Sequence, residues 1–287
     1  MLVLTAPRER GLSEADLASA VDAMGGCSGP PHRLGVAAAE IICYHPPKLE
    51  AVSAALPGVD VNTIPAVGRR KRILIADMDS TIIPVECIDE VADFAGVKDQ
   101  VARITEQAMA GELDFEGALR ARLALVKGLP EEALARVFAE RIRLNPGARV
   151  LVRTMAAHGA HTALASGGFT YFTERVARAA GFAENRANRL LFEDGRLSGG
   201  VAEPILGRAA KLEALTGIAR RLGVGTEAAM AVGDGANDIS IIEAAGLGVA
   251  YHAKPALAAQ ADAVIRHADL TALLHLQGYS EAEFHRD

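Results

Sequence analysis

The feature that most constrains the fold is a short apolar run that ends abruptly in two carboxylates. The run Ile73-Leu74-Ile75-Ala76 has no polar residue, and Asp77 and Asp79 follow it directly. A strand without polar residues is buried on both faces, which is typical of parallel sheets with helices on each side. Because such sheets bind ligands at the carboxyl ends of their strands, the sequence predicts a site at this edge.

Composition indicates a soluble globular protein of one large or two moderate domains. The chain has 287 residues, of which 50% are hydrophobic and 23% are charged, and that suits a chain with a sizeable core. It has no apolar run near the ~20 residues that span a bilayer, and its first residues lack the basic start and apolar core of a signal peptide. Cys27, Cys43 and Cys87 form no disulfide or zinc pattern, which favours a reducing cytoplasm.

Charge and aromatic content argue against nucleic acid as a partner. The net charge is −6, aromatic residues make up 4% of the chain, and tryptophan is absent. The basic stripe and the stacking residues that nucleic-acid binding uses are therefore missing. Neither nucleic acid nor a membrane is expected as a partner.

Residues 1–70 are predicted to form a small α+β domain, separate from residues 71–287. Its expected order of elements, β-α-β-α-β, resembles a trimmed ACT-type regulatory fold, with Leu34–Tyr44 as one long strand or two strands joined by a bend. Small domains of this type often pair, so a homodimer is one option and the oligomeric state stays open. At the other end, the polar residues 280–287 are expected to fray.

A helical cap is predicted between the first strand of the larger domain and its second. Residues of about 85–145 place apolar side chains at helical spacing, as in Phe115-x-x-Ala118-Leu119-x-x-Arg122. This insertion is far longer than a simple strand-to-helix connection. We therefore expect it to act as a lid over the strand edge.

Further polar groups follow two other predicted strands of the larger domain. Ser166-Gly167-Gly168 ends one strand, Gly233-Asp234 ends another, and Lys211 opens a helix between them. Parallel strands would bring these groups to one edge, where several carboxylates repel one another unless a cation offsets them. Oxygen ligands without nearby histidine or cysteine favour Mg²⁺, and a lysine with a glycine-rich turn suits a phosphate.

Each of these residues also has a plainer interpretation. Asp77 and Asp79 could cap a strand end, Lys211 could lie on a solvated helix face, and Asp-x-Asp also occurs in metal-dependent glycosyltransferases. The cap residues Met109 and Phe115 could serve only the packing of the lid. The joint occurrence of the motifs in order argues for a shared chemical role.

In that order the motifs resemble those of the haloacid dehalogenase superfamily. They are Asp77-x-Asp79-Ser80-Thr81, Ser166-Gly167-Gly168, Lys211 and Gly233-Asp234-Gly235-x-Asn237-Asp238. From about Ile73 to Gly278 the chain closely resembles the branch that hydrolyses O-phospho-L-serine, the last step of L-serine biosynthesis. The resemblance implies an α/β fold, with a Rossmann-like parallel sheet and a helical cap inserted after its first strand, and a Mg²⁺-dependent phosphomonoester hydrolase.

The resemblance also implies catalytic and metal-binding roles. Asp77 would attack phosphorus and form an aspartyl-phosphate, and Asp79 would act as acid and then base, which requires a raised pKa. Mg²⁺ would be held by Asp77, the main-chain carbonyl of Asp79, and Asp234. Ser166 and Lys211 would hold phosphate oxygens. The remaining motif residues, Asn237 and Asp238, would orient the metal ligands, and Asn237 would also contact the substrate.

Substrate choice is expected in the cap, where the resemblance again assigns roles. Glu86 would bind the ammonium group of the substrate and Arg122 its carboxylate, while Met109 and Phe115 would close the apolar side. Gly167 and Gly168 would let the backbone approach the small-molecule substrate. A different phospho-amino acid or small phosphate ester is the alternative substrate, and a non-catalytic amino-acid sensor is the rival function.

Overall fold

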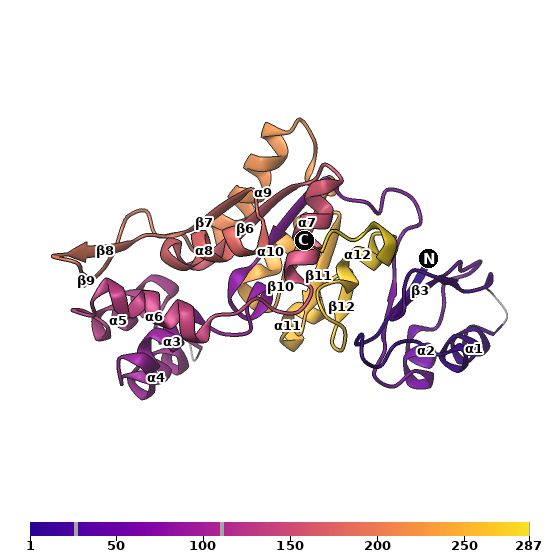
Figure 1. Cartoon of the computed structure of the whole chain (residues 1–287), viewed down its shortest axis with the longest axis horizontal. Helices are drawn as coiled ribbons and strands as arrows, with labels where there is room; N and C mark the ends of the chain where they lie inside the picture. Colours follow the sequence, from indigo (N-terminus) through magenta and orange to yellow (C-terminus); the bar gives the residue numbers. More distant parts are fainter. Residues whose placement is uncertain (26–27, 110–111, 287) are drawn as a thin grey trace.

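The computed structural model describes residues 1–25, 28–109 and 112–286, with the side chain of Met109 left out. Figure 1 shows an elongated molecule in three parts: a small N-terminal unit at one end, a central sheet, and a group of helices with a hairpin at the other end. Among the described residues, no helix is both long and apolar enough to cross a membrane.

The central sheet has six parallel strands in the order β12-β11-β10-β5-β6-β7. Their apolar residues are almost entirely buried, as for Ile73 to Ala76, which have no exposed surface. This confirms the predicted α/β fold with a parallel core. The strands are β5 (Ile73–Ala76), β6 (His161–Phe169), β7 (Glu184–Asn188), β10 (Ala229–Gly233), β11 (Leu247–Tyr251) and β12 (Ala263–Ile265).

Helices cover both faces of this sheet, because alternate strand residues enter two separate apolar clusters. Ile73 and Ile75 pack against α9, α10 and α11, whereas Leu74 and Ala76 belong to the cluster that includes α7, α8 and α12. The helices are α7 (Ala148–Ala157), α8 (Thr170–Ala180), α9 (Arg208–Arg221), α10 (Ile239–Ala244), α11 (Pro255–Ala258) and α12 (Ala272–Leu276).

The insertion after β5 forms the predicted helices at the far end of the molecule (Figure 1). They are α3 (Cys87–Phe94), α4 (Lys98–Met109), α5 (Phe115–Leu125) and α6 (Glu131–Arg141). The hairpin of β8 (Leu190–Glu193) and β9 (Arg196–Val201) reaches from the core and pairs with this cap, since the amide of Gly128 donates to the carbonyl of Leu197 at 2.7 Å. The turn residues Asp194 and Gly195 both have positive φ, as an Asp-Gly hairpin requires.

The N-terminal unit is a four-stranded antiparallel sheet in the order β2-β3-β1-β4 with two helices. Its order β-α-β-β-α-β is that of a ferredoxin-like fold, because the segment Leu34–Tyr44 forms one strand and a bend, and a second short strand precedes it. The division of the chain at residue 70 stays a prediction. The elements are β1 (Leu2–Thr5), α1 (Glu14–Ala23), β2 (His32–Arg33), β3 (Ala38–Ile41), α2 (Leu49–Ala55) and β4 (Asp60–Thr63).

Two polar side chains of β4 join the N-terminal unit to the central sheet. The amide of Asn62 donates to the carbonyl of Val264 at 3.1 Å and accepts from its N–H at 2.8 Å. The carboxylate of Asp60, 3% exposed, accepts the N–H groups of Arg266, His267 and Ala268 at 2.7, 3.1 and 2.9 Å. The contact is therefore specific and largely buried.

The expectation that residues 280–287 fray is wrong for the described part of this segment. Ser280 and Glu283 form a capping box around the short 3₁₀ turn Glu281–Glu283, and Glu283 pairs with Arg70 at 2.7 Å. Glu281 accepts the N–H of Val36 at 3.0 Å. The tail is ordered because residues more than 200 positions earlier supply its partners.

We expect Asp60→Ala to lower the free energy of unfolding by about 2–4 kcal/mol, because three N–H groups, of which that of Ala268 is buried, lose a charged and buried acceptor. Urea denaturation would measure the loss. Asp22→Ala, at an exposed position of α1, is the control and should change stability little. Equal stabilities of the two variants would contradict the importance of this contact.

Candidate active site

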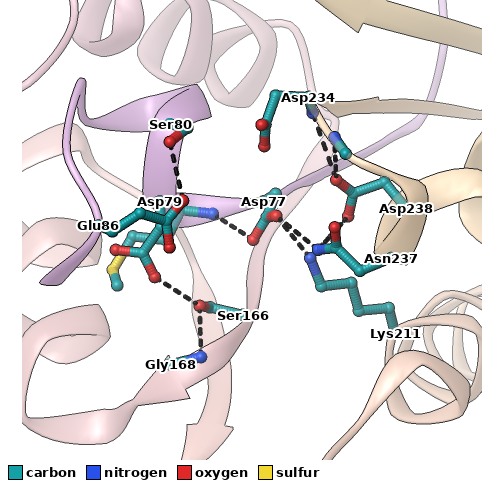
Figure 2. A network of polar contacts seen from close by, with 12 residues as sticks. Asp77, Asp79, Ser80, Glu86, Ser166, Gly168, Lys211, Asp234, Asn237 and Asp238 are labelled. Atoms are coloured by element: carbon teal, nitrogen blue, oxygen red, sulfur yellow. Dashed lines mark hydrogen bonds and ion pairs between the residues drawn. The ribbon is translucent and has the colours of Figure 1, made fainter. Parts of the chain in front are cut away.

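Asp77 follows β5 at the carboxyl edge of the central sheet. Its N–H donates to the carbonyl of Val232 on β10 at 3.0 Å, which continues the ladder of the sheet up to the carboxylate. The side chain, in a residue 4% exposed, accepts the N–H of Met78 through Oδ1 at 2.7 Å. Its Oδ2 faces the opposite way, toward α9 and the loop after β10 (Figure 2).

Lys211 lies between two carboxylates and balances their charge. Its Nζ is 2.7 Å from Oδ2 of Asp77 and 2.6 Å from Oδ1 of Asp238, and all three residues are buried. Burial alone would favour the neutral amine, but the two anions outweigh it and raise the pKa of Lys211. The lysine is therefore a fixed cation at this edge of the sheet.

The loop after β10 supplies the other carboxylates. Oδ2 of Asp238 accepts the N–H groups of Asp234 and Gly235 at 3.3 Å each, so both of its oxygens have partners. Nδ2 of Asn237 donates to Oδ2 of Asp77 at 3.2 Å. Asp238 thus orients the loop that carries Asp234 toward Asp77.

Asp234 has the properties of a metal ligand. In the described part of the chain no other residue donates a hydrogen bond to its carboxylate, although the residue is only 8% exposed. Burial and the nearby charge of Asp77 raise its pKa, and carboxylate oxygens of Asp77, Asp234 and Asp238 lie within 4.8 Å of one another. Such an all-oxygen set fits a hard divalent cation.

Asp79 occupies a different environment from Asp77, although only one residue separates them. Oδ1 of Asp79 accepts the N–H of Cys87 at 3.0 Å, and Oδ2 lies 3.4 Å from Oγ of Ser166. Burial first, and then the negative charges of Glu86 and Asp77, raise the pKa of Asp79 to about 7. Its carboxylate lies outside the cluster of Asp77, Asp234 and Asp238, and its metal contact through the main-chain carbonyl stays a prediction.

The irregular segment Ser166–Gly168 of β6 packs directly on Asp79. Oγ of Ser166 accepts the N–H of Gly168 at 2.8 Å. A Cβ at Gly168 would lie 2.9 Å from Oδ2 of Asp79 and 3.0 Å from Oγ of Ser166, so only glycine leaves room for this contact. Ser80, with a φ of 55°, turns the chain sharply after Asp79 and donates from Oγ to Glu86 at 2.8 Å.

The cap places further predicted residues around a cleft of about 640 Å³. Glu86 lines it at the start of α3, and Arg122 and Phe115 line it from α5, opposite Asp77, Asp79 and Lys211. Nε of Arg122 donates to the carbonyl of Ala118 at 3.2 Å, and among the described residues its guanidinium makes no other hydrogen bond. The side chain of Met109 lies outside the described residues.

Three more charged residues line the cleft and were not singled out from the sequence. Asp89 lies one helical turn after Glu86, Arg208 lies one turn before Lys211, and Lys254 follows β11. The i, i+3 spacing to a predicted site residue was a usable signal for the first two. Lys254 gave no such signal, because it lies at the site only through the return of β11 to the same edge.

The assembled groups have distinct chemical capacities. Asp77 is a carboxylate held by a cation, Asp79 is an acid whose pKa lies near neutrality, and Asp234 offers a carboxylate that accepts no hydrogen bond from another described residue. Glu86, which accepts the hydroxyl of Ser80, and Arg122 bring two opposite charges to the cleft from the cap. The roles predicted for these residues remain predictions, but the structure places them around one cleft (Figure 2 shows the core of this network).

Comparisons with known proteins relate the chain to hydrolases. Residues 74–243 match the model of the haloacid dehalogenase-like hydrolase family. A phosphoserine phosphatase of Archaeoglobus fulgidus is 44% identical over 75% of this chain, and the match spans 63% of that relative. The chain thus spans less than two thirds of the length of this relative.

Solved structures agree over most of the chain. A probable phosphoserine phosphatase from Vibrio cholerae, in its unliganded form, covers 98% of this chain and 87% of its own with a TM-score of 0.83 and 32% identity. A phospho-aspartyl intermediate analogue of phosphoserine phosphatase covers 72% of this chain and 98% of its own, at 40% identity and a TM-score of 0.66. By sequence and by fold, the chain belongs to the haloacid dehalogenase-like hydrolase family and resembles its phosphoserine phosphatases.

Proposed function

We propose that the chain hydrolyses O-phospho-L-serine to L-serine and phosphate. The observation that carries the proposal is the division of one cleft into two ends. Asp77, Asp79 and Lys211 line the core end, and Glu86 and Arg122 line the cap end. A substrate with a phosphate at one end and a zwitterion at the other matches both ends at once.

The two aspartates suit the two halves of a double displacement. An oxygen of Asp77 would attack phosphorus while Asp79, protonated at the start, gives its proton to the departing serine oxygen. Asp79 would then take a proton from the water that cleaves the aspartyl-phosphate. The pKa of Asp79 near 7 supports this exchange of roles, and the fixed cation of Lys211 offsets the charge that gathers on Asp77.

We also propose Mg²⁺ as the cation, held by Asp77, Asp234 and the carbonyl of Asp79. When bound, it would offset negative charge on the transferring phosphoryl group. The nearly buried carboxylate of Asp234, which accepts no hydrogen bond from another described residue, supports this proposal. By analogy with the phosphoserine phosphatases, the reaction would be the last step of L-serine biosynthesis, in the cytoplasm.

Asp77→Asn should lower phosphate release from phosphoserine by at least about 10³-fold, because an amide does not attack phosphorus. In wild type, acid-quenched turnover should leave one phosphoryl group on the protein, detectable by mass spectrometry. Asp22→Asn is the control. An Asp77→Asn enzyme with more than a tenth of wild-type turnover would refute the aspartyl-phosphate.

Removal of divalent cations with EDTA should abolish activity, and Mg²⁺ should restore it. Mg²⁺ should also raise the melting temperature of the EDTA-treated protein, because it binds only the folded state. Asp234→Asn should lose this increase in melting temperature, whereas Asp22→Asn should keep it. Full activity after exhaustive EDTA dialysis would contradict a metal-dependent mechanism.

Arg122→Ala should lower kcat/KM for O-phosphoserine by about 100-fold, because the carboxylate loses a bidentate partner. The effect on O-phosphoethanolamine, which has no carboxylate, should stay within about threefold. Arg120→Ala is a matched control on the same helix, since Arg120 is exposed and pairs with Glu203 instead. Equal losses on both substrates, or faster turnover of a sugar phosphate by wild type, would favour another phosphate ester.

A further inference from the structure

Asn188, the last residue of β7, joins two segments that carry predicted phosphate ligands. Its side chain is 1% exposed. Nδ2 donates to the carbonyl of Gly167 at 2.8 Å and to that of Leu206 at 3.1 Å, and Oδ1 accepts the N–H of Leu206 at 2.7 Å. Both donor hydrogens and the acceptor oxygen therefore have partners inside the protein.

The first segment needs this contact because the sheet is interrupted there. β6 and β7 pair regularly up to Ala165 and Arg186, and pairing resumes only at Phe169 and Asn188. Residues 166–168 therefore leave the regular register of the ladder. There the side chain of Asn188 donates to the Gly167 carbonyl and fixes the irregular segment in which Ser166 faces Asp79.

The second segment leads into the helix that carries Lys211. Leu206 precedes Gly207 and the start of α9 at Arg208, so Lys211 lies in the first turns of this helix. Because Asn188 binds both main-chain groups of Leu206, it fixes where α9 begins. The distance of 2.7 Å between Lys211 and Asp77 depends on that position.

The cap also contacts this junction. A Cβ at Gly167 and a Cβ at Gly207 would each lie 3.4 Å from the ring of Phe115. The ring therefore lies over the two segments that Asn188 connects. Their relative position sets both the phosphate end of the cleft and the surface on which the cap rests.

We propose that Asn188 is a positioning residue for phosphoryl transfer, which holds the Ser166–Gly168 turn and the start of α9 in register around the phosphate. It does not touch the substrate. The inference rests on the proposed phosphoserine phosphatase activity. Displacements of about 1 Å at a reacting centre can cost about 10²-fold in rate, so loss of these hydrogen bonds should appear in catalysis as well as in stability.

The test compares Asn188→Asp with Asn185→Asp. Asn188→Asp keeps an acceptor oxygen for the N–H of Leu206 but loses both donors of the amide. Asn185 lies on the same strand but away from the cleft, and among the described residues its Oδ1 accepts a hydrogen bond only from Thr173, at 2.8 Å. Steady-state kinetics with phosphoserine and inhibition by inorganic phosphate are measured well below the melting temperature of each variant.

We expect Asn188→Asp to lower kcat about 10²-fold and to raise the inhibition constant of inorganic phosphate about tenfold, because both predicted phosphate ligands move. Asn185→Asp should keep kcat and the inhibition constant of inorganic phosphate within about twofold of the wild-type values. If Asn188→Asp does not fold, Asn188→Ser is measured instead. Because serine keeps one hydrogen-bond donor, we expect this variant to show a smaller loss of kcat than the loss of about 10²-fold expected for Asn188→Asp, but a clearly larger one than Asn185→Asp shows.

A lower melting temperature with unchanged kcat and phosphate inhibition would reduce Asn188 to a purely structural residue and overturn the inference. The proposed function has a separate criterion. If wild type does not hydrolyse phosphoserine, that function fails, whereas an active wild type with fully active Asn188 variants refutes only the positioning role.

Discussion

The ion pair network of Lys211 with Asp77 and Asp238 is the constraint on which the active site depends. Two buried carboxylates this close would repel strongly without the cation between them. Removal of one partner from a buried network leaves an uncompensated charge, which commonly costs about 3–5 kcal/mol. The ends of β5 and β10 and the first turns of α9 must therefore meet at one point, and the remainder of the cleft is arranged around it.

The same edge gives two neighbouring aspartates opposite properties. Asp77 contacts a lysine and an amide, whereas Asp79 lies among Glu86, Ser166 and the start of α3. After Asp79 the chain turns at Ser80 and brings the N–H of Cys87 back to Oδ1 of Asp79. One short segment can thus carry a carboxylate paired with a lysine beside a carboxyl group that exchanges protons, which a double displacement requires.

Much of this site could be predicted from the sequence because its residues follow apolar strands. Asp77 and Asp234 directly follow such strands, Ser166 lies where the regular pairing of β6 stops, and parallel strands share one edge. β7 gave no comparable signal, since Glu184-Asn185-Arg186-Ala187-Asn188 is mostly polar, and the role of Asn188 was missed with it. The ordered tail was missed for another reason: its stabilising partners, Arg70 and Val36, are distant in sequence.

The contact between Asn62 and Val264 has a consequence for solubility. β12 is the outermost strand of the central sheet on its side, and an uncovered outer strand offers free N–H and C=O groups to other chains. Asn62 occupies both groups of Val264 as a neighbouring strand would, and Asp60 occupies the amides that follow. The N-terminal unit therefore protects the β12 edge of the sheet from intermolecular pairing, and this protection does not depend on any regulatory role.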